Sequence, residues 1–143
     1  MNSADNLASK TVMDEENKTH NYIITESVYK SFLCAFGDES PIHVDENEAR
    51  AAGFPTVVMH GNILNGFISH FVGMIYPGRQ SLLMSVDIRY VNPSYMNDEI
   101  EIKAKVVHFL ESKKVIELLL MLNNITQSYT AAKCKVIVKL REQ

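Results

Sequence analysis

Apolar residues between positions 61 and 75 recur at spacings of one, three and four, which is the pattern of one face of an α-helix. The stripe consists of Ile63, Leu64, Phe67, Ile68, Phe71, Val72 and Ile75. Tyr76, Pro77 and Gly78 follow, and this combination ends a helix. The middle of the chain is therefore predicted to be one long, largely apolar helix.

After residue 80 the helical period gives way to an alternation of apolar and polar residues, which is typical of strands. Strands are predicted at residues 83–91, 99–109 and 129–140. The run 115–122 is apolar on both faces and should be the central strand. Because the connections between these strands are short, the strands should pair antiparallel.

The first quarter of the chain contains shorter elements. Residues 1–20 are polar and of mixed charge, so they are expected to form a flexible tail, and residues 22–24 can form a short strand. A short helix is predicted at residues 28–33, with Thr25 or Ser27 as its N-cap.

Residues 37–61 form a long and mostly irregular connection. Pro41 and Pro55 interrupt it, and Asp45 can cap a helix of one or two turns that runs from Glu46 to Ala52. Connections of this length within a compact domain are usually functional.

Together these elements predict an α+β protein with a single domain at residues 21–143, in which a curved antiparallel sheet wraps around one long central helix. This is the layout of the hotdog fold. A single sheet of this kind leaves edge strands open, so we expect a homodimer or an assembly of dimers.

The bulk properties exclude several classes of partner. The 143 residues are 46% hydrophobic and 22% charged, with a formal net charge of -3 and no long run of Lys or Arg, which argues against nucleic acid. The N-terminus lacks the apolar segment of a signal peptide. Residues 63–75 are too short and too polar to span a bilayer, so a cytoplasmic protein without a membrane partner is expected.

The two cysteines, Cys34 and Cys134, lie far apart and resemble neither a disulfide framework nor a metal site. We expect two buried thiols in a reducing compartment. Cys34 lies in an apolar run, where a thiol is usually inert, so it is a weak candidate for a nucleophile.

Asp38 and His43 are the first candidates for chemistry, because five residues across Pro41 can place both side chains at one cavity. A carboxylate and an imidazole are the groups that reversible hydration requires, since one activates the water and the other delivers the substrate proton. Short Asp/His pairs are common, however, and the spacing alone leaves a solvated polar loop as the simpler interpretation.

Two further arrangements are open at this stage. His43, Asp45 and His60 could bind a metal with one free position, although no paired motif such as HExxH is present. The first turn of the helix that follows His60 has free N–H groups, which can stabilise an oxyanion near Gly61. A glycine at a helix start explains Gly61 equally well.

The segment 36–45, which reads FGDESPIHVD, is followed by Ala49, by Gly53-Phe54 and by His60-Gly61. This arrangement resembles the MaoC-like hydratases, which include the (R)-specific enoyl-CoA hydratases. Arg89-Tyr90, Pro93 and Asn97-Asp98 are similar to a downstream segment of the same family. The resemblance covers about residues 24–140.

The resemblance implies reversible addition of water to a trans-2-enoyl thioester of coenzyme A or acyl-carrier protein, in fatty acid metabolism, without a metal or redox cofactor. It implies that Asp38 and His43 bind and activate the water and that the backbone N–H of Gly61 faces the thioester oxygen. The other residues implied at the oxyanion or substrate site are Ser40, His60 and Ser69.

Three positions depart from the family pattern. Ser40 stands where Asn is most frequent, and it can still donate and accept one hydrogen bond. Asn62 stands where an apolar residue is usual, so it could narrow the substrate entrance or change its polarity. Asn97 replaces a turn glycine, and Asn tolerates the left-handed backbone.

Two alternative functions remain at the level of sequence. A hotdog acyl-CoA thioesterase more often places its carboxylate on the central helix, and residues 62–75 contain no Asp or Glu. A non-catalytic acyl-thioester-binding module would not need the Asp/His pair.

Overall fold

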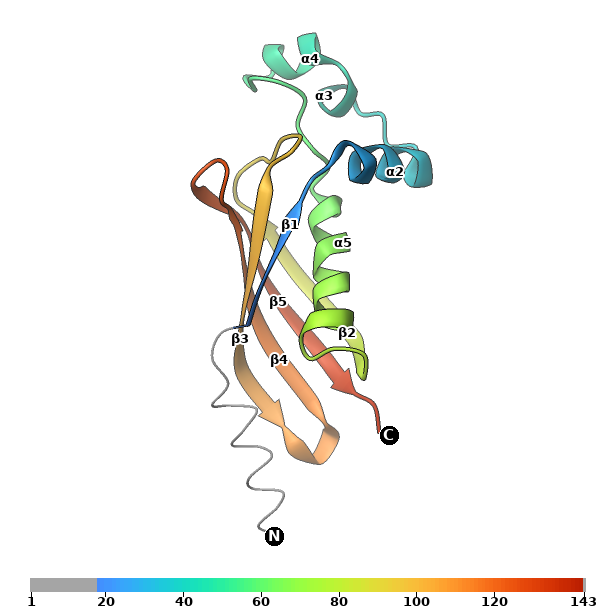
Figure 1. The fold of residues 1–143 in the computed structure, drawn as a ribbon, viewed down its shortest axis with the longest axis vertical. Helices are drawn as coiled ribbons and strands as arrows, with labels where there is room; N and C mark the ends of the chain where they lie inside the picture. The colour runs from blue at the N-terminus through green and yellow to red at the C-terminus, as the bar shows by residue number, and fades with distance from the viewer. Residues whose placement is uncertain (1–17, 143) are drawn as a thin grey trace.

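A five-stranded antiparallel sheet curves around one helix in the computed structural model, which describes residues 18–142 (Figure 1). The strands lie in the order β1-β3-β4-β5-β2. Their bounds are β1 Lys18–Ile23, β2 Ser81–Tyr90, β3 Glu99–Leu110, β4 Val115–Asn124 and β5 Tyr129–Leu140. The predicted hotdog fold is confirmed, and the predicted strand at 129–140 has the observed bounds.

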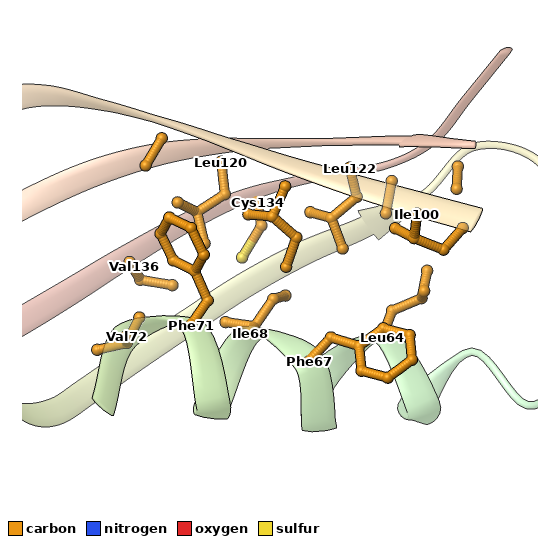
Figure 2. Packing of buried hydrophobic residues seen from close by; sticks show 14 of the residues in the cluster. Leu64, Phe67, Ile68, Phe71, Val72, Ile100, Leu120, Leu122, Cys134 and Val136 are labelled. Carbon is orange, nitrogen blue, oxygen red and sulfur yellow. The ribbon is translucent and has the colours of Figure 1, made fainter. Parts of the chain in front are cut away.

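The central helix consists of α5, Asn62–His70, which continues as a π-helical turn over Phe71–Ile75. It packs along the concave face of the sheet, where Leu64, Phe67, Ile68, Phe71 and Val72 point at the strands (Figure 2). The predicted apolar stripe is therefore the buried face of this helix. Its last member, Ile75, is exposed because the π-turn rotates the chain out of the stripe.

Strand β4 lies at the middle of the sheet, as its composition predicts, but only one of its faces is covered. Its residues Ile116, Leu118, Leu120 and Leu122 are buried under the helix. Leu119 points to the opposite face and is 42% exposed. The described part of one chain offers no helix to cover that outer face.

The N-terminal elements extend the sheet and lead to the helical segment. Strand β1 pairs with β3 from Lys18 onward, so residues 18–20 belong to the sheet rather than to the predicted tail. Residues 1–17 of that tail lie outside the described residues. Helix α2, Glu26–Phe36, begins at Thr25, whose side chain accepts a hydrogen bond from the Val28 N–H at 3.1 Å.

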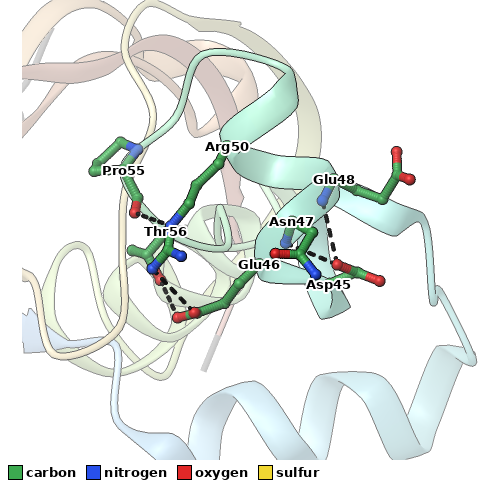
Figure 3. Close-up of polar contacts among 7 residues, drawn as sticks. All are labelled: Asp45, Glu46, Asn47, Glu48, Arg50, Pro55 and Thr56. Carbon is green, nitrogen blue, oxygen red and sulfur yellow. Dashed lines mark hydrogen bonds and ion pairs between the residues drawn. The ribbon is translucent and has the colours of Figure 1, made fainter.

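Two short helices, α3 at Pro41–Val44 and α4 at Glu46–Ala51, lie within the connection that the sequence marks as irregular. The Asp45 carboxylate caps α4 by accepting hydrogen bonds from the backbone N–H groups of Asn47 and Glu48 (Figure 3). The Glu46 carboxylate accepts hydrogen bonds from Arg50 and Thr56, which fastens the returning chain to α4.

The turn between β2 and β3 is built around a buried carboxylate. Asn97 has a φ of 67°, the left-handed conformation expected of it. Asp98, which is 2% exposed, accepts hydrogen bonds from the Tyr95 N–H, Asn124 Nδ2 and Gln127 Nε2 at 2.8, 2.6 and 2.9 Å. This network fixes the turn against the end of β4.

The cysteines differ from each other in environment. Cys134 is buried in the core, and burial raises the pKa of its thiol to about 11. Cys34 is exposed on α2, which corrects the expectation of two buried thiols, because α2 has no fully buried residue. Among the described helices, none combines the length and apolar character needed to cross a bilayer.

Candidate active site

Asp38, His43 and His60 converge where the helical segment meets the start of α5. Asp38 follows α2, His43 lies in α3, and His60 precedes α5. One nitrogen or oxygen atom from each side chain lies within 4.8 Å of the others. The rings of His43 and His60 are 4.0 Å apart between centroids and inclined by 32°.

The His43 ring is oriented by a backbone carbonyl. Its Nδ1 lies 2.6 Å from the Val58 oxygen, and because a carbonyl only accepts, Nδ1 must carry the proton and donate it. The Nε2 atom of the neutral ring is therefore left as a proton acceptor. The Tyr29 hydroxyl donates to the His43 carbonyl oxygen at 2.6 Å and anchors the backbone of α3.

The Asp38 carboxylate remains accessible, with its side chain 46% exposed. The backbone N–H of Ser40 donates to Asp38 Oδ1 at 3.2 Å. Hydrogen bonds from the Ser40 side chain and backbone lower the pKa of Asp38, and the nearby His60 and His43 lower it further. The carboxylate is therefore ionised at neutral pH and can accept a hydrogen bond from water.

His60 is placed to hold the backbone of Asp38. Its side chain is 2% exposed, and its Nε2 donates to the Asp38 carbonyl oxygen at 2.7 Å. The distance from Nε2 to the Asp38 carboxylate is 4.0 Å, too long for a hydrogen bond. The Nδ1 atom is buried without a hydrogen-bond partner among the described residues.

Gly61 provides space for an aromatic ring. It is the N-cap of α5, and a Cβ added there would lie 3.0–3.2 Å from three carbons of the Tyr90 ring. Such contacts are tighter than usual, so a side chain at Gly61 would require the Tyr90 ring to shift by a few tenths of an ångström. Its backbone N–H makes none of the hydrogen bonds found among residues 18–142, which leaves it as a donor at the helix start.

Two cavities meet at this site. The first, of about 470 Å³, is lined by Asp38, His43, Gly61, Asn62 and Tyr90 among others. The second, of about 890 Å³, lies between α2 and α5 and has a mostly apolar lining that includes Val28, Phe32, Phe36, Ile63 and Phe67. Asp38 and Asn62 line both cavities, so the two lie side by side at these residues.

Other residues that the sequence suggested lie elsewhere. Ser69 is exposed on α5 and lines neither cavity, so the structure does not bring it to the Asp/His pair. Asp45 is engaged in the cap of α4. The contact of Tyr90 with Gly61 was not foreseen, although an aromatic residue at the end of a strand was part of the recognised pattern.

Asp38, His43 and His60 are also the residues that could hold a metal, and Asp38 takes the place that the sequence gave to Asp45. Two imidazoles and a carboxylate suit several divalent metals. His43 Nδ1 and His60 Nε2, however, already donate to backbone carbonyls, and the other His60 nitrogen is buried. This leaves the half-exposed Asp38 carboxylate and His43 Nε2 as the groups of the cluster that could act on a bound molecule.

The fold and the site together define a hotdog protein in which the side chains of Asp38 and His43 lie close together and line one cavity. The chain belongs to the MaoC-like family, since the model of the MaoC like domain matches residues 8–126.

Known relatives are hydratases and dehydratases. The chain is 28% identical over 93 residues to an (R)-specific enoyl-CoA hydratase of Rhodospirillum rubrum, and the match covers 65% of each chain. It is 25% identical over 116 residues to a mitochondrial 3-hydroxyacyl-[acyl-carrier-protein] dehydratase of Arabidopsis thaliana, covering 79% of this chain and 68% of that one.

Solved structures share the fold at lower identity. An unliganded (R)-hydratase of Pseudomonas aeruginosa superposes with a TM-score of 0.80 and 19% identity, over 90% of this chain and 81% of that chain. An (R)-hydratase from A. caviae superposes with a TM-score of 0.79 and 21% identity, over 87% and 94% of the two chains.

Proposed function

We propose that this protein is an (R)-specific enoyl-CoA hydratase or 3-hydroxyacyl-thioester dehydratase that acts in fatty acid metabolism. The observation that carries the proposal is the accessible pair formed by the Asp38 carboxylate and His43 Nε2, in a cavity that also contains the N–H of Gly61. The hydratase and dehydratase relatives support the reaction class.

The proposed chemistry uses the groups of this cavity. Asp38 and His43 Nε2 hold one water between them, and one of the two takes its proton as the oxygen adds to C3 of the enoyl group. The Gly61 N–H donates to the thioester oxygen, where negative charge develops as the double bond is drawn toward the carbonyl. The pair then delivers the proton taken from the water to C2, which completes the addition and restores both groups, and the reverse sequence removes water.

The apolar cavity between α2 and α5 suits the acyl chain. Asp38 and Asn62 line both this cavity and the one at Gly61, so an acyl chain placed here would have its thioester close to Gly61. Its volume of about 890 Å³ falls within the range of sites that enclose a whole small molecule. Each methylene that enters it should gain about 0.8 kcal/mol.

The test is an assay of the purified protein with trans-2-enoyl-CoAs of increasing chain length and with the same acyl groups on acyl-carrier protein. We expect loss of the enoyl absorbance and formation of a 3-hydroxyacyl thioester. Release of free thiol instead would identify a thioesterase, and binding without either product would identify a non-catalytic module.

The variants Asp38→Asn and His43→Gln should each lower kcat by about 10²–10⁴, the range for positioned acid–base groups. The double variant should be little worse than either single one, because two groups that share one water act as a unit. Circular dichroism should match that of the wild type, since Asp38 is half exposed. Wild-type turnover in either folded variant would contradict the assignment.

A further inference from the structure

Three polar side chains form a closed cycle of hydrogen bonds beside the candidate site. Asn65 Nδ2 donates to Asn62 Oδ1 at 2.8 Å and to the Tyr90 hydroxyl at 2.7 Å. The Tyr90 hydroxyl donates to Asn62 Oδ1 at 3.2 Å. The cycle ties the first turn of α5 to the end of edge strand β2.

The cycle leaves one set of donors free. Both lone pairs of Asn62 Oδ1 are occupied, one by Asn65 and one by Tyr90. The two N–H groups of Asn62 Nδ2 make none of the hydrogen bonds found among residues 18–142. Because its oxygen is held from two directions, the amide of Asn62 is fixed in orientation with its nitrogen unpaired.

The position of Asn62 in the chain and in the cavity linings puts this residue beside the candidate site. Asn62 follows Gly61 directly, and it lines both cavities, as Asp38 does. The ring of Tyr90 also lies beside Gly61, so the tyrosine that hydrogen-bonds to Asn62 contacts both residues at the start of α5.

We propose that the Asn62 side-chain amide is a second hydrogen-bond donor to the thioester oxygen, beside the N–H of Gly61, and that Asn65 and Tyr90 position it. The substrate in this inference is that of the proposed function. Two preorganised donors stabilise developing negative charge better than one, and a fixed amide requires no reorganisation when the charge forms. With an apolar residue at position 62, the Gly61 N–H would be the single proposed donor to the thioester oxygen.

The kinetic test compares Asn62→Leu, Tyr90→Phe and the double variant. Asn62→Leu should lower kcat and kcat/KM together by about 10², the lower end of the range for an oxyanion donor, with an unchanged melting temperature. Tyr90→Phe removes only the hydroxyl and should lower kcat by a smaller factor. The double variant should have the same kcat as Asn62→Leu, because Tyr90 acts through Asn62. A further drop in kcat in the double variant, as large as that of Tyr90→Phe alone, would overturn the positioning role.

A binding test separates this inference from the hydratase proposal. Hexanoyl-CoA and S-hexyl-CoA differ in the carbonyl oxygen, and neither can be hydrated. Calorimetry should show that the wild type binds hexanoyl-CoA more tightly than S-hexyl-CoA. In Asn62→Leu the ratio of the two affinities should fall by about tenfold, the effect of losing one hydrogen bond. This result would hold even if enoyl-CoA were not hydrated. Equal preferences in the two proteins, or binding of neither ligand, would overturn the assignment of Asn62.

Discussion

At the scale of single residues, Ser40 governs the ionisation of Asp38. Its side chain and backbone N–H are the main causes of the lowered pKa of that carboxyl. In Ser40→Ala the side-chain hydrogen bond is lost, so the pKa of Asp38 should rise toward its ordinary value. Since the proposed reaction needs the ionised carboxylate, the acid limb of kcat/KM should shift to higher pH, while the rate near neutrality changes little.

The pH profile of kcat/KM and the titration of the Asp38 carboxyl carbon by NMR would both report this shift. Ser69→Ala is the matched control, because Ser69 is exposed on α5 and lines neither cavity. Identical acid limbs in the wild type and Ser40→Ala would show that Asp38 does not set the limb.

Gly61 should be intolerant of side chains for a reason that the structure makes specific. In Gly61→Val the Cβ would lie within 3.2 Å of the Tyr90 ring, which must move and disturb the donor at the start of α5. Hydration should fall by about 10²–10³, as for loss of an oxyanion donor. Gly73→Ala is the control, because its Cβ meets no atom within 4 Å. Full activity of folded Gly61→Val would remove Gly61 from the mechanism.

The part of the site that the sequence could predict is local in the chain. Asp38 and His43 are joined by five residues across Pro41, so their approach depends on short-range geometry. The contact of Tyr90 with Gly61 depends on the register of β2 against β5 and on the packing of α5, which no local pattern encodes. Ser69, which the resemblance implied, is exposed on α5 and is not among the residues that line either cavity.

At the scale of elements, the spacing of apolar residues predicted the helices and strands that bury only one face. The helix stripe and β5 follow this rule, because each has one face on the core. Strand β2 does not follow this rule, because its pairing with β5 shifts register at Met84. Met84, Val86 and Tyr90 are exposed, although they occupy the alternate positions that the sequence pattern marks as apolar. A bulge changes which set of alternate residues faces the core, and an edge strand has fewer neighbours to cover it.

The β2–β3 turn should depend on Asp98 for stability. Asp98→Ala would leave the Tyr95 N–H, Asn124 Nδ2 and Gln127 Nε2 without their acceptor in a buried region. An unsatisfied buried polar group costs about 1–3 kcal/mol, so the free energy of unfolding should fall by about 3 kcal/mol. Urea denaturation would measure it. Asp87→Ala, an exposed change on β2, should lie within about 0.5 kcal/mol of the wild type.

At the scale of the whole molecule, one of the two edge strands of the described sheet, β2, carries several exposed apolar side chains. Strand β2 pairs with β5 on one side only. Its exposed apolar residues, with those just beyond it, are Leu82, Met84, Val86, Tyr90 and Val91. An edge that combines unpaired backbone groups with apolar side chains favours pairing with another strand. Because β2 ends at the candidate site, a second copy placed there would cover Tyr90 and its neighbours.

We therefore predict a homodimer joined through β2. Light scattering should give twice the 16.2 kDa of one chain at micromolar concentration. Val86→Lys places a charge at the edge and should shift the protein toward the monomer, whereas Leu119→Lys, on the outer face of β4, should leave the dimer intact. Activity should fall with dimer content in Val86→Lys, because Tyr90 on the same strand orients the Asn62 amide. A wild-type monomer, or equal dissociation in both variants, would contradict pairing through β2.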